Sequence, residues 1–476
     1  MDNGERKRQL WALGILGFFG ILSIGAYAVN EYFIYIAVYI WFGFIYGMCL
    51  QYGRFCFSSA FRDLFAVGVP RMFVGIMIAT VLFGAVGAVV SVSGMSTFHA
   101  APTSMHAIVA GIVFGVGMVF AGGCASGSLY KTGEGNGSAL LVVLSLSTTI
   151  ALFAPAGGFL NKLVPQSWNE SAVAKGLPES INAGDGWLDQ YLAGFIWDQP
   201  IITYAGMFGM SDQSVAGAFF GNLLVGVVIP SAILLAVVYI FWSRRSYIKK
   251  REKAGITGMT FKDEAGGYWT MIMASRRTAI AGLILGIAAG LQMLVTQGLR
   301  IKFGVKNVGT IFERLGYDSG LSVNGTVFDP GYWYVTTQEG QWMGWVFNKL
   351  GAENMDNIYF GFANGIPNPL INAPGWMSIA LIGGAAVMAL LHNEFKFKKP
   401  TLELATWAIV GGILMGIGSR LGLGCNVGAF FVRVSQGDAS GWLFGVGMTA
   451  GAYIGVKFFN WWTARKMEKE FAGMEL

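Results

Sequence analysis

The chain has 476 residues, of which 54% are hydrophobic and only 12% are charged, whereas soluble domains carry about 25% charged residues. So few charges leave too little polar surface to face water, which excludes a string of soluble domains. The net charge of +6 sits in short basic clusters between apolar runs, a pattern that orients a membrane protein and does not indicate nucleic-acid binding.

Ten uncharged apolar runs follow one another along the chain, and each is a candidate membrane span. They cover about 10–29, 32–50, 72–92, 105–121, 138–160, 214–242, 278–298, 376–391, 404–419 and 441–456. The first run is long enough to span and is followed by no small-residue cleavage pattern, so we predict a span rather than a signal peptide. The expected fold class is an all-α polytopic membrane protein.

Basic residues predict the orientation of these spans. If Arg6, Lys7 and Arg8 lie in the cytoplasm and the spans alternate, most of the 32 Lys and Arg residues fall in cytoplasmic segments, as the positive-inside rule requires. The strongest internal anchor is the basic cluster 244–253. We therefore expect a bacterial inner-membrane protein with both termini in the cytoplasm.

The sequence repeats itself across its two halves. Residues 111–127 align without a gap on 412–428, and seven of the seventeen positions are identical, Cys124 and Cys425 among them. The two matching spans run in opposite senses in this topology, which predicts a 5+5 inverted repeat with re-entrant or broken helices, an architecture of transporters.

The repeat divides the chain into five parts. We predict a first half at 1–160, an external loop at 161–213, the start of the second half with a basic cytoplasmic loop at 214–298, an external insertion at 299–375, and the rest of the second half at 376–476.

Four cysteines carry the distinctive chemistry of the chain: Cys49, Cys56, Cys124 and Cys425. No CxxC pair occurs and the three histidines do not cluster near them in sequence, so zinc, haem and a disulfide framework are not supported. We predict no metal and no cofactor. Cys49 lies inside an apolar run and is interpreted as a small buried hydrophobe.

Cys124 and Cys425 each follow an apolar helix that stops at glycines, and each begins a polar or Gly-rich segment. Gly123, Gly424 and Asn426 are their immediate neighbours. Irregular backbone at membrane depth is tolerated where it lines a cavity, and freed N–H groups there suit an anion. A thiol is soft and polarizable, so it can bind a sulfur-bearing ion weakly enough to release it. We predict a substrate path at these residues.

Cys56 lies in a short apolar segment with Arg62 and Asp63. Two interpretations stand: a cytoplasmic loop helix with a local ion pair, or a re-entrant segment that brings Cys56 to the inner mouth. The ten spans contain no Asp or Glu, so coupling or electrostatic roles fall to residues outside them: Arg62, Asp63, Glu134 and Arg420.

Three motifs resemble those of the YeeE/YedE membrane family. They are Cys56-Phe-Ser-Ser-Ala-Phe-Arg-Asp63, Gly122-Gly-Cys-Ala-Ser-Gly127 and Gly422-Leu-Gly-Cys-Asn-Val-Gly428. The resemblance implies uptake of thiosulfate, with Cys56, Cys124 and Cys425 relaying the ion through transient S–H···S contacts. It also implies a cytoplasmic sulfur-carrier or rhodanese-type partner that receives the imported sulfur. Since relatives are associated with selenium metabolism, a selenium compound is an alternative substrate.

A membrane-embedded thiol enzyme or sulfur-transfer protein is the rival hypothesis. Such an enzyme needs a thiolate activated beside a His or a cation; no His is near a cysteine in sequence, although Arg54, Arg62 and Arg420 are. The repeat favours transport, so we expect a transporter of thiosulfate or a related small sulfur anion.

Overall fold

The computed structural model of the protein describes residues 3–94, 98, 100, 101, 103, 105–153, 202–256, 258–304, 335–352 and 369–472. Most of the predicted external loop 161–213 and much of the predicted insertion 299–375 lie outside the described residues.

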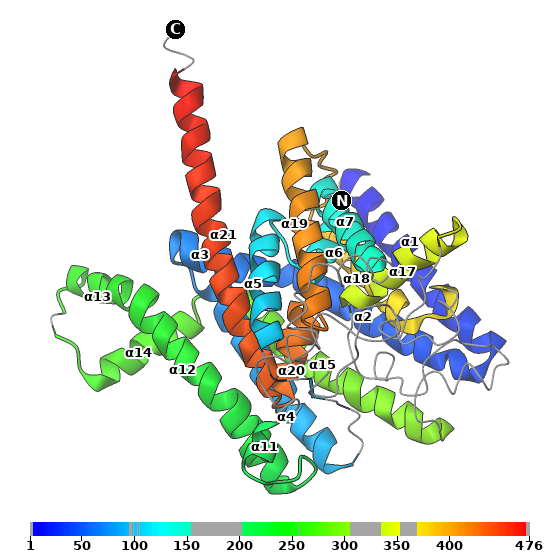
Figure 1. The fold of residues 1–476 in the computed structure, drawn as a ribbon, viewed down its shortest axis with the longest axis horizontal. Coiled ribbons are helices and arrows are strands. Elements are labelled where there is room, and N and C mark those ends of the chain that lie inside the picture. The colour runs from blue at the N-terminus through cyan, green and yellow to red at the C-terminus, as the bar shows by residue number, and fades with distance from the viewer. Residues whose placement is uncertain are drawn as a thin grey trace, which may run out of the picture.

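The described residues fold into helices (Figure 1), because a chain in lipid must satisfy its backbone hydrogen bonds within each segment. The first half comprises α1 (Asn3–Val29), η1 (Glu31–Phe33), α2 (Ile34–Gly53), α3 (Phe57–Val67), α4 (Arg71–Val92), α5 (Met105–Phe120), α6 (Ala125–Gly133) and α7 (Gly137–Phe153). The second half comprises α11 (Tyr204–Met207), η2 (Ala216–Val228), α12 (Ile229–Val238), η3 (Tyr239–Ser243), α13 (Arg244–Lys253), α14 (Phe261–Ile272), α15 (Arg276–Phe303), α17 (Val335–Lys349), η6 (Pro369–Ile371), α18 (Ala373–Leu391), α19 (Leu402–Leu421), η7 (Asn426–Val432), α20 (Arg433–Ser435) and α21 (Ala439–Ala472).

Within the described part of the chain, 9 helical segments are long and apolar enough to cross a membrane, and α7 is a shorter apolar helix. Each of the ten predicted spans coincides with one of these helices over its described residues, and only residues 154–160 of the span 138–160 lie outside them. The predicted fold class, an all-α polytopic membrane protein, is confirmed. The last three spans are longer than their apolar runs suggested: α18, α19 and α21 have 19, 20 and 34 residues.

The helices pack in pairs that recur across the two halves. α5 packs on α21 and α19 on α7; α2 packs on α18 and α15 on α4; α3 packs on α21 and α17 on α7. These six contacts form three matched pairs. Each contact becomes its match when every helix is replaced by its counterpart in the other half of the chain. The counterparts are α2 and α15, α3 and α17, α4 and α18, α5 and α19, and α7 and α21. The helices that carry the sequence repeat therefore occupy equivalent packing positions.

Glycines bring the paired helices into backbone contact. A Cβ atom at Gly111 or Gly115 of α5 would collide with the backbone of α21, and one at Gly447 or Gly451 of α21 would collide with the backbone of α5. Small residues allow such close approach, which strengthens dispersion contacts where lipid supplies no hydrophobic driving force. Many of the glycines of the chain therefore lie in interfaces between helices.

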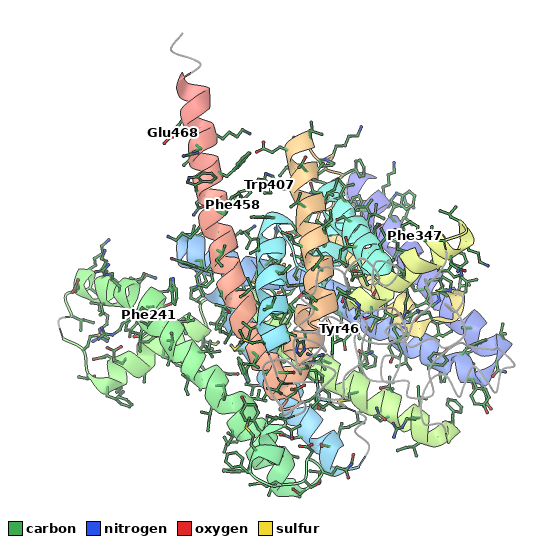
Figure 2. All side chains as sticks on the ribbon, viewed as in Figure 1. Tyr46, Phe241, Phe347, Trp407, Phe458 and Glu468 are labelled. Atoms are coloured by element: carbon green, nitrogen blue, oxygen red, sulfur yellow. The ribbon has the colours of Figure 1, made fainter. Side chains whose placement is uncertain are left out.

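The surface of the bundle is apolar where lipid would face it. On α1, Ile21 is 75% exposed and Trp11 is 62% exposed, which is costly in water but not in hydrocarbon. Helices α12 and α13 lead to a hairpin with α14 at the edge of the bundle, and α21 projects beyond it (Figure 1). Aromatic side chains such as Trp407 and Phe458 fill the space between α19 and α21 (Figure 2), with ring centroids 6.3 Å apart.

Helix α17 lies in the range that we predicted to be an external insertion. Its N-terminal half, Val335–Gln341, is buried, and the helix packs on α6, α7 and α18. Part of this range thus belongs to the core of the molecule. The segment is rich in Thr, Gln and Glu, so its sequence does not read as a buried helix.

Candidate functional site

Cys124 and Cys425 each form the N-cap of a short helix. The Sγ atom of Cys124 accepts a hydrogen bond from the N–H of Gly127 at 3.3 Å, at the start of α6. The Sγ atom of Cys425 accepts one from the N–H of Val427 at 3.4 Å, at the start of η7. Both cysteines are buried. Each sulfur therefore takes the place that a Ser or Asp side chain usually fills at a helix N-terminus.

The backbone before each cysteine turns sharply so that a new helix can begin. Gly122 and Leu423 both adopt left-handed conformations, with φ of 64° and 54°. Gly424 has φ of 149°, a conformation that favours glycine. At Gly123, by contrast, a Cβ atom would press on the hydroxyl of Ser128, 3.0 Å away. The two loops therefore share a left-handed residue two positions before the cysteine and differ at the next position.

A basic side chain that follows each cysteine hydrogen-bonds to the loop before that cysteine. Lys131 lies on α6, and Arg433 is the first residue of α20, which continues η7. Lys131 Nζ donates to the carbonyl of Gly122 at 2.5 Å. Arg433 donates to the carbonyls of Gly422 and Leu423 at 3.2 and 3.3 Å. These charge-assisted hydrogen bonds hold the turn that carries the cysteine.

The equivalence of these two basic residues is hidden in the sequence. Cys124 and Cys425 differ by 301 positions, but Lys131 and Arg433 differ by 302. The extra residue is accommodated by the π-helical turn of η7, as one-residue insertions in helices commonly are. A gapless comparison of the two halves loses the match at this point.

Cys56 meets Cys124 although they lie on different segments. The residue precedes α3, and its Sγ atom is 3.7 Å from the Sγ atom of Cys124. Gly127 makes this approach feasible, because a Cβ atom there would lie 3.1 Å from the Cys124 sulfur and closer still to the Cys56 sulfur. The N-termini of α3 and α6 thus meet at a pair of thiols.

Cys425 has a different set of neighbours. On α17, the side chain of Thr336 is a hydrogen-bond partner of the Cys425 thiol, and Glu339 is close enough to interact with this thiol electrostatically. The next residue, Asn426, is completely buried, and neither atom of its amide group has a hydrogen-bond partner among the described residues. An unpaired buried amide is costly, so this side of the site has unused donors and acceptors.

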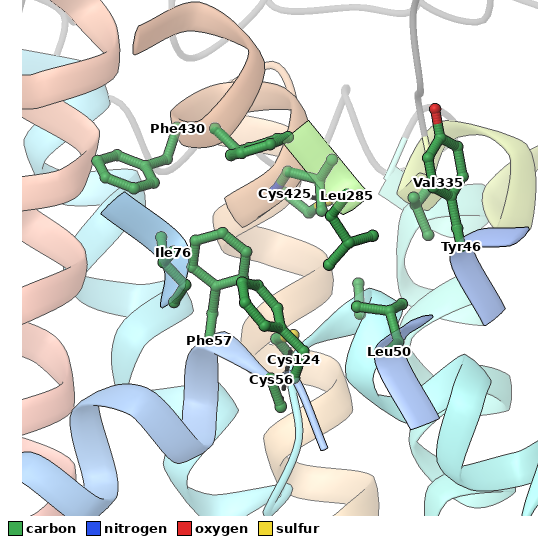
Figure 3. Packing of buried hydrophobic residues seen from close by; sticks show 14 of the residues in the cluster. Tyr46, Leu50, Cys56, Phe57, Ile76, Cys124, Leu285, Val335, Cys425 and Phe430 are labelled. Carbon is green, nitrogen blue, oxygen red and sulfur yellow. Dashed lines mark hydrogen bonds between the residues drawn. The ribbon is translucent and has the colours of Figure 1, made fainter. Parts of the chain in front are cut away.

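A small cavity of about 20 Å³ lies next to the segments that follow Cys56, Cys124 and Cys425. Ser126 and Val427, two residues after Cys124 and Cys425, both line it, together with apolar side chains of α2, α3, α4 and α15. Figure 3 shows Cys425 apart from the Cys56–Cys124 pair, with apolar side chains such as Phe57 and Leu285 in this region. A single water needs about 10–15 Å³, so the cavity holds about one water and has no room for an anion of several heavy atoms.

An aromatic cluster lies at this cavity. The ring of Phe57, which follows Cys56, lies 6.1 Å from the ring of Phe430 and 6.5 Å from that of Phe431. Phe57 and Phe431 also line the small cavity. These rings make the lining of the cavity apolar, which disfavours water there.

A charged cluster lies at one end of the site. Arg54, just before Cys56, pairs with Glu394 at 3.0 Å, and Gln51 donates to the same carboxylate at 2.7 Å. Burial opposes ionisation of Glu394, but the hydrogen bonds from Gln51 and Arg54 outweigh it and lower its pKa. Burial raises the pKa of the predicted residue Glu134, against the attraction of Arg54 and Lys131.

A larger cavity of about 130 Å³ opens near the end of α20. Its polar lining includes Ser91, Thr203, Asn222, Ser435 and Gln436. The Nε2 atom of Gln436 has no hydrogen-bond partner among the described residues. Gln436 is the equivalent of Glu134 in the other half of the chain. A neutral amide thus stands beside the larger cavity at the position where the charged cluster around Arg54 has a carboxyl group.

Two predicted electrostatic residues pair with each other. Arg62 and Asp63 form an ion pair of 3.0 Å on the partly exposed face of α3, and no described contact joins them to a cysteine. Arg420, in contrast, is buried at the end of α19 with 1% of its surface exposed. Among the described residues, no group of three or more His, Cys, Asp and Glu side chains is arranged to hold a metal ion.

Sequence reasoning missed several residues of this site. Lys131, Thr336, Glu339 and Arg433 were not singled out. The cationic pair could have been found by allowing one insertion in the repeat. Glu339 gave no such signal, because nothing in the sequence indicates that α17 reaches Cys425.

Comparisons with known proteins give the family. The chain is 27% identical over 403 residues to the thiosulfate transporter TsuA of Spirochaeta thermophila, covering 84% of this chain and 92% of that protein. It is 22% identical over 414 residues to the thiosulfate transporter TsuA of Escherichia coli, covering 86% and 91%. The probable transporter YedE of Escherichia coli is 31% identical over 128 residues, or 27% of this chain and 32% of that protein.

A family described as sulphur transport matches residues 52–454, which include all three cysteine motifs and both halves of the repeat. The predicted family is confirmed. Taken with the apolar helices, the match identifies a multi-pass membrane transporter rather than an enzyme. The chain belongs to the sulphur transport family, the YeeE/YedE family.

Proposed function

We propose that the protein takes up thiosulfate, or a closely related small sulfur anion, along a path lined by Cys56, Cys124 and Cys425. The geometry of the three thiols supports this proposal most strongly. The Sγ atoms of Cys56 and Cys124 lie 3.7 Å apart. Cys425 caps η7, the counterpart of α6, and the small apolar cavity lies next to the segments that follow all three cysteines. The anion passes from Cys425 to the Cys56–Cys124 pair when the cavity opens.

Helix N-termini supply the attraction for the anion. α3, α6 and η7 each begin at one of the three cysteines. Unpaired N–H groups and the positive ends of helix dipoles stabilise negative charge at such positions. Weak binding to thiols and N–H groups allows release, whereas an arginine fork would hold the ion more tightly.

Alternation between the two sides follows from the repeat. We propose that the halves 1–160 and 214–476 are inverted repeats in which α17 is the counterpart of α3, with 161–213 and the parts of 299–375 that flank α17 as connections on the outer side. The recurrent helix pairs support this assignment. Movement of the aromatic cluster around Phe57 and Phe431 would open the cavity on one side at a time.

The orientation of the protein in the membrane sets the direction of transport. The basic clusters favour an inner membrane with both termini in the cytoplasm, so Cys425 faces the outer side and the Cys56–Cys124 pair faces the cytoplasm. Gly123, Gly424 and Asn426 shape the two loops and contribute N–H or amide groups to the path. A cytoplasmic sulfur-carrier or rhodanese-type protein receives the sulfur.

Uptake by proteoliposomes tests the function. The purified protein should concentrate ³⁵S-thiosulfate inside vesicles without converting it chemically, and empty vesicles should not. Unlabelled thiosulfate should compete more strongly than sulfate, sulfite or selenium anions. Uptake that only selenium compounds inhibit would assign a selenium substrate, and conversion without accumulation would contradict transport.

A further inference from the structure

Glu339 is a completely buried carboxyl group in the core of the protein. Its exposed surface is 0%, and neither carboxyl oxygen has a hydrogen-bond partner among the described residues. A buried carboxylate without a partner is strongly disfavoured, whereas a protonated carboxyl is not. The site therefore favours a carboxyl group that carries a proton.

Glu339 lies on the face of α17 that is turned toward Cys425. Thr336 lies one turn earlier on the same helix, and both residues are neighbours of the Cys425 thiol. The equivalent helix α3, which begins after Cys56, has Phe61 as its fifth residue where α17 has Glu339. Only the Cys425 half of the site carries a carboxyl group at this place.

The surroundings contain few charges that could neutralise Glu339. Helices α7 and α18, which pack on α17, carry no ionisable side chain. On α6, Tyr130 interacts with Cys56, Cys124, Glu134 and Arg54.

Among the described residues, no cation is hydrogen-bonded to either carboxyl oxygen of Glu339. Lys131 binds the carbonyl of Gly122, and the buried Arg420 makes no hydrogen bond to Glu339. Cys425 is the described ionisable group on which Glu339 acts.

Resting on the proposed function, we propose that Glu339 is a proton-binding site that couples anion transport to proton transport. A dianion at Cys425 and an ionised Glu339 repel each other, so the anion binds when Glu339 has taken a proton from the outer solution. The anion and the proton then leave toward the cytoplasm. One proton per dianion reduces the charge moved from two to one, which lessens the opposition of the membrane potential.

The test uses proteoliposomes containing the full chain, clamped at zero membrane potential, with ³⁵S-thiosulfate outside and a pH-sensitive dye inside. The wild-type protein should take up thiosulfate several-fold faster at an external pH of about 6 than at about 8, and the lumen should acidify as thiosulfate enters. Glu339→Gln mimics the protonated carboxyl, so it should retain uptake but lose both the pH dependence and the proton movement.

Glu403→Gln is the matched control, because Glu403 is an exposed carboxylate paired with Lys466 at 2.5 Å. It should behave like the wild type. Thiosulfate uptake by the wild type without acidification would overturn the coupling alone, and this readout holds even if Glu339→Gln does not fold. Acidification that persists in Glu339→Gln would also overturn it. Absence of any wild-type uptake would overturn the proposed function itself.

Discussion

The Sγ atoms of Cys56 and Cys124 lie 3.7 Å apart, and a glycine at position 127 leaves room for both. Each of the two residues starts a helix, α3 and α6 respectively. Two soft sulfur atoms and two helix N-termini are thus concentrated at one point in the core. An anion with a sulfur atom of its own would find both polarizable contacts and positive potential there.

The paired thiols should chelate a soft metal ion. We expect the purified protein to bind Cd²⁺ through Cys56 and Cys124, because thiolate ligands select soft ions. Absorption of Cd–thiolate bonds in the ultraviolet measures the complex. Cys56→Ser or Cys124→Ser should remove most of the signal.

Cys49→Ser serves as the control for this measurement. Cys49 is buried within α2 and has no thiol partner within hydrogen-bond distance among the described residues. The Cd²⁺ signal should be unchanged in this variant. An undiminished signal in Cys56→Ser would show that the two thiols do not bind the ion together.

Gly127→Ala should impair the site. Its Cβ atom would collide with the Cys56 sulfur and press on the Cys124 sulfur, so the two thiols must separate. Overpacking of this kind costs about 1–3 kcal/mol. We expect a lower melting temperature and at least a several-fold loss of thiosulfate uptake in vesicles.

The repeat supplies a matched control for the glycine. Gly428 is the equivalent residue after Cys425, and a Cβ atom there meets nothing within 4 Å. Gly428→Ala should therefore be stable and active. Equal losses in both variants would indicate a general sensitivity of short helices to alanine rather than contact with the thiols.

Arg433→Met should destabilise the loop that holds Cys425. The variant loses two charge-assisted hydrogen bonds to the carbonyls of Gly422 and Leu423. It also leaves the buried Asp438, 4.0 Å from Arg433, without its cation. Removing one member of a buried charge pair costs about 3–5 kcal/mol, which thermal unfolding in detergent should detect.

Two outcomes separate this role from a general effect of lost charge. Arg245→Met, at an exposed residue of α13, should change the free energy of unfolding by less than about 0.5 kcal/mol, so its melting temperature should stay close to that of the wild type. A melting temperature of Arg433→Met equal to that of Arg245→Met would contradict the role of Arg433 in the loop.

The hairpin of α13 and α14 should weaken in acid. Hydrogen bonds from the Thr260 side chain and backbone, together with Arg251, lower the pKa of Asp263 to about 2, against about 3.9 in an unfolded chain. Because the folded pKa is lower, this stabilisation is present above pH ~3.9 and is lost as the pH falls toward ~2. Hydrogen exchange of residues 261–272, corrected for intrinsic rates, should accelerate over that range.

Asp263→Asn removes the titrating group from the capping box. Its hydrogen exchange at neutral pH should already be faster than that of the wild type, and the acid dependence should be reduced. A wild-type hairpin with the same protection at pH ~3 and pH ~6 would rule out this contribution of the Asp263 carboxylate.

The membrane helices could be predicted because their physics is local. An uncharged run of about 20 residues has few alternatives to a spanning helix, and each of the ten runs proved to be helical. Cys124 and Cys425 could be singled out because the repeat places them at matching helix breaks. For Cys56 the sequence left two interpretations, a cytoplasmic loop helix or a re-entrant segment at the inner mouth, since no pattern in the sequence gives the path of the chain after α2. The contact between Cys56 and Cys124 was therefore not predicted.

The remaining residues could not be predicted, for two physical reasons. The match between Lys131 and Arg433 is displaced by the π-helical turn of η7, so a gapless alignment conceals it. Glu339 lies in the range 299–375, which the sequence analysis assigned to an external insertion. Its burial depends on packing between α17 and the core helices, which is a tertiary property.

Movement of the anion along the cysteines can be measured by uptake of ³⁵S-thiosulfate into proteoliposomes that contain Cys124→Ser or Cys425→Ser. Serine keeps the shape of cysteine but is hard and strongly hydrated, so each variant should fold like the wild type. We expect uptake at least about tenfold slower, equivalent to about 1.4 kcal/mol, while Cys49→Ser transports normally. Thiosulfate uptake at the wild-type rate in both Cys124→Ser and Cys425→Ser would show that the anion does not move along these cysteines.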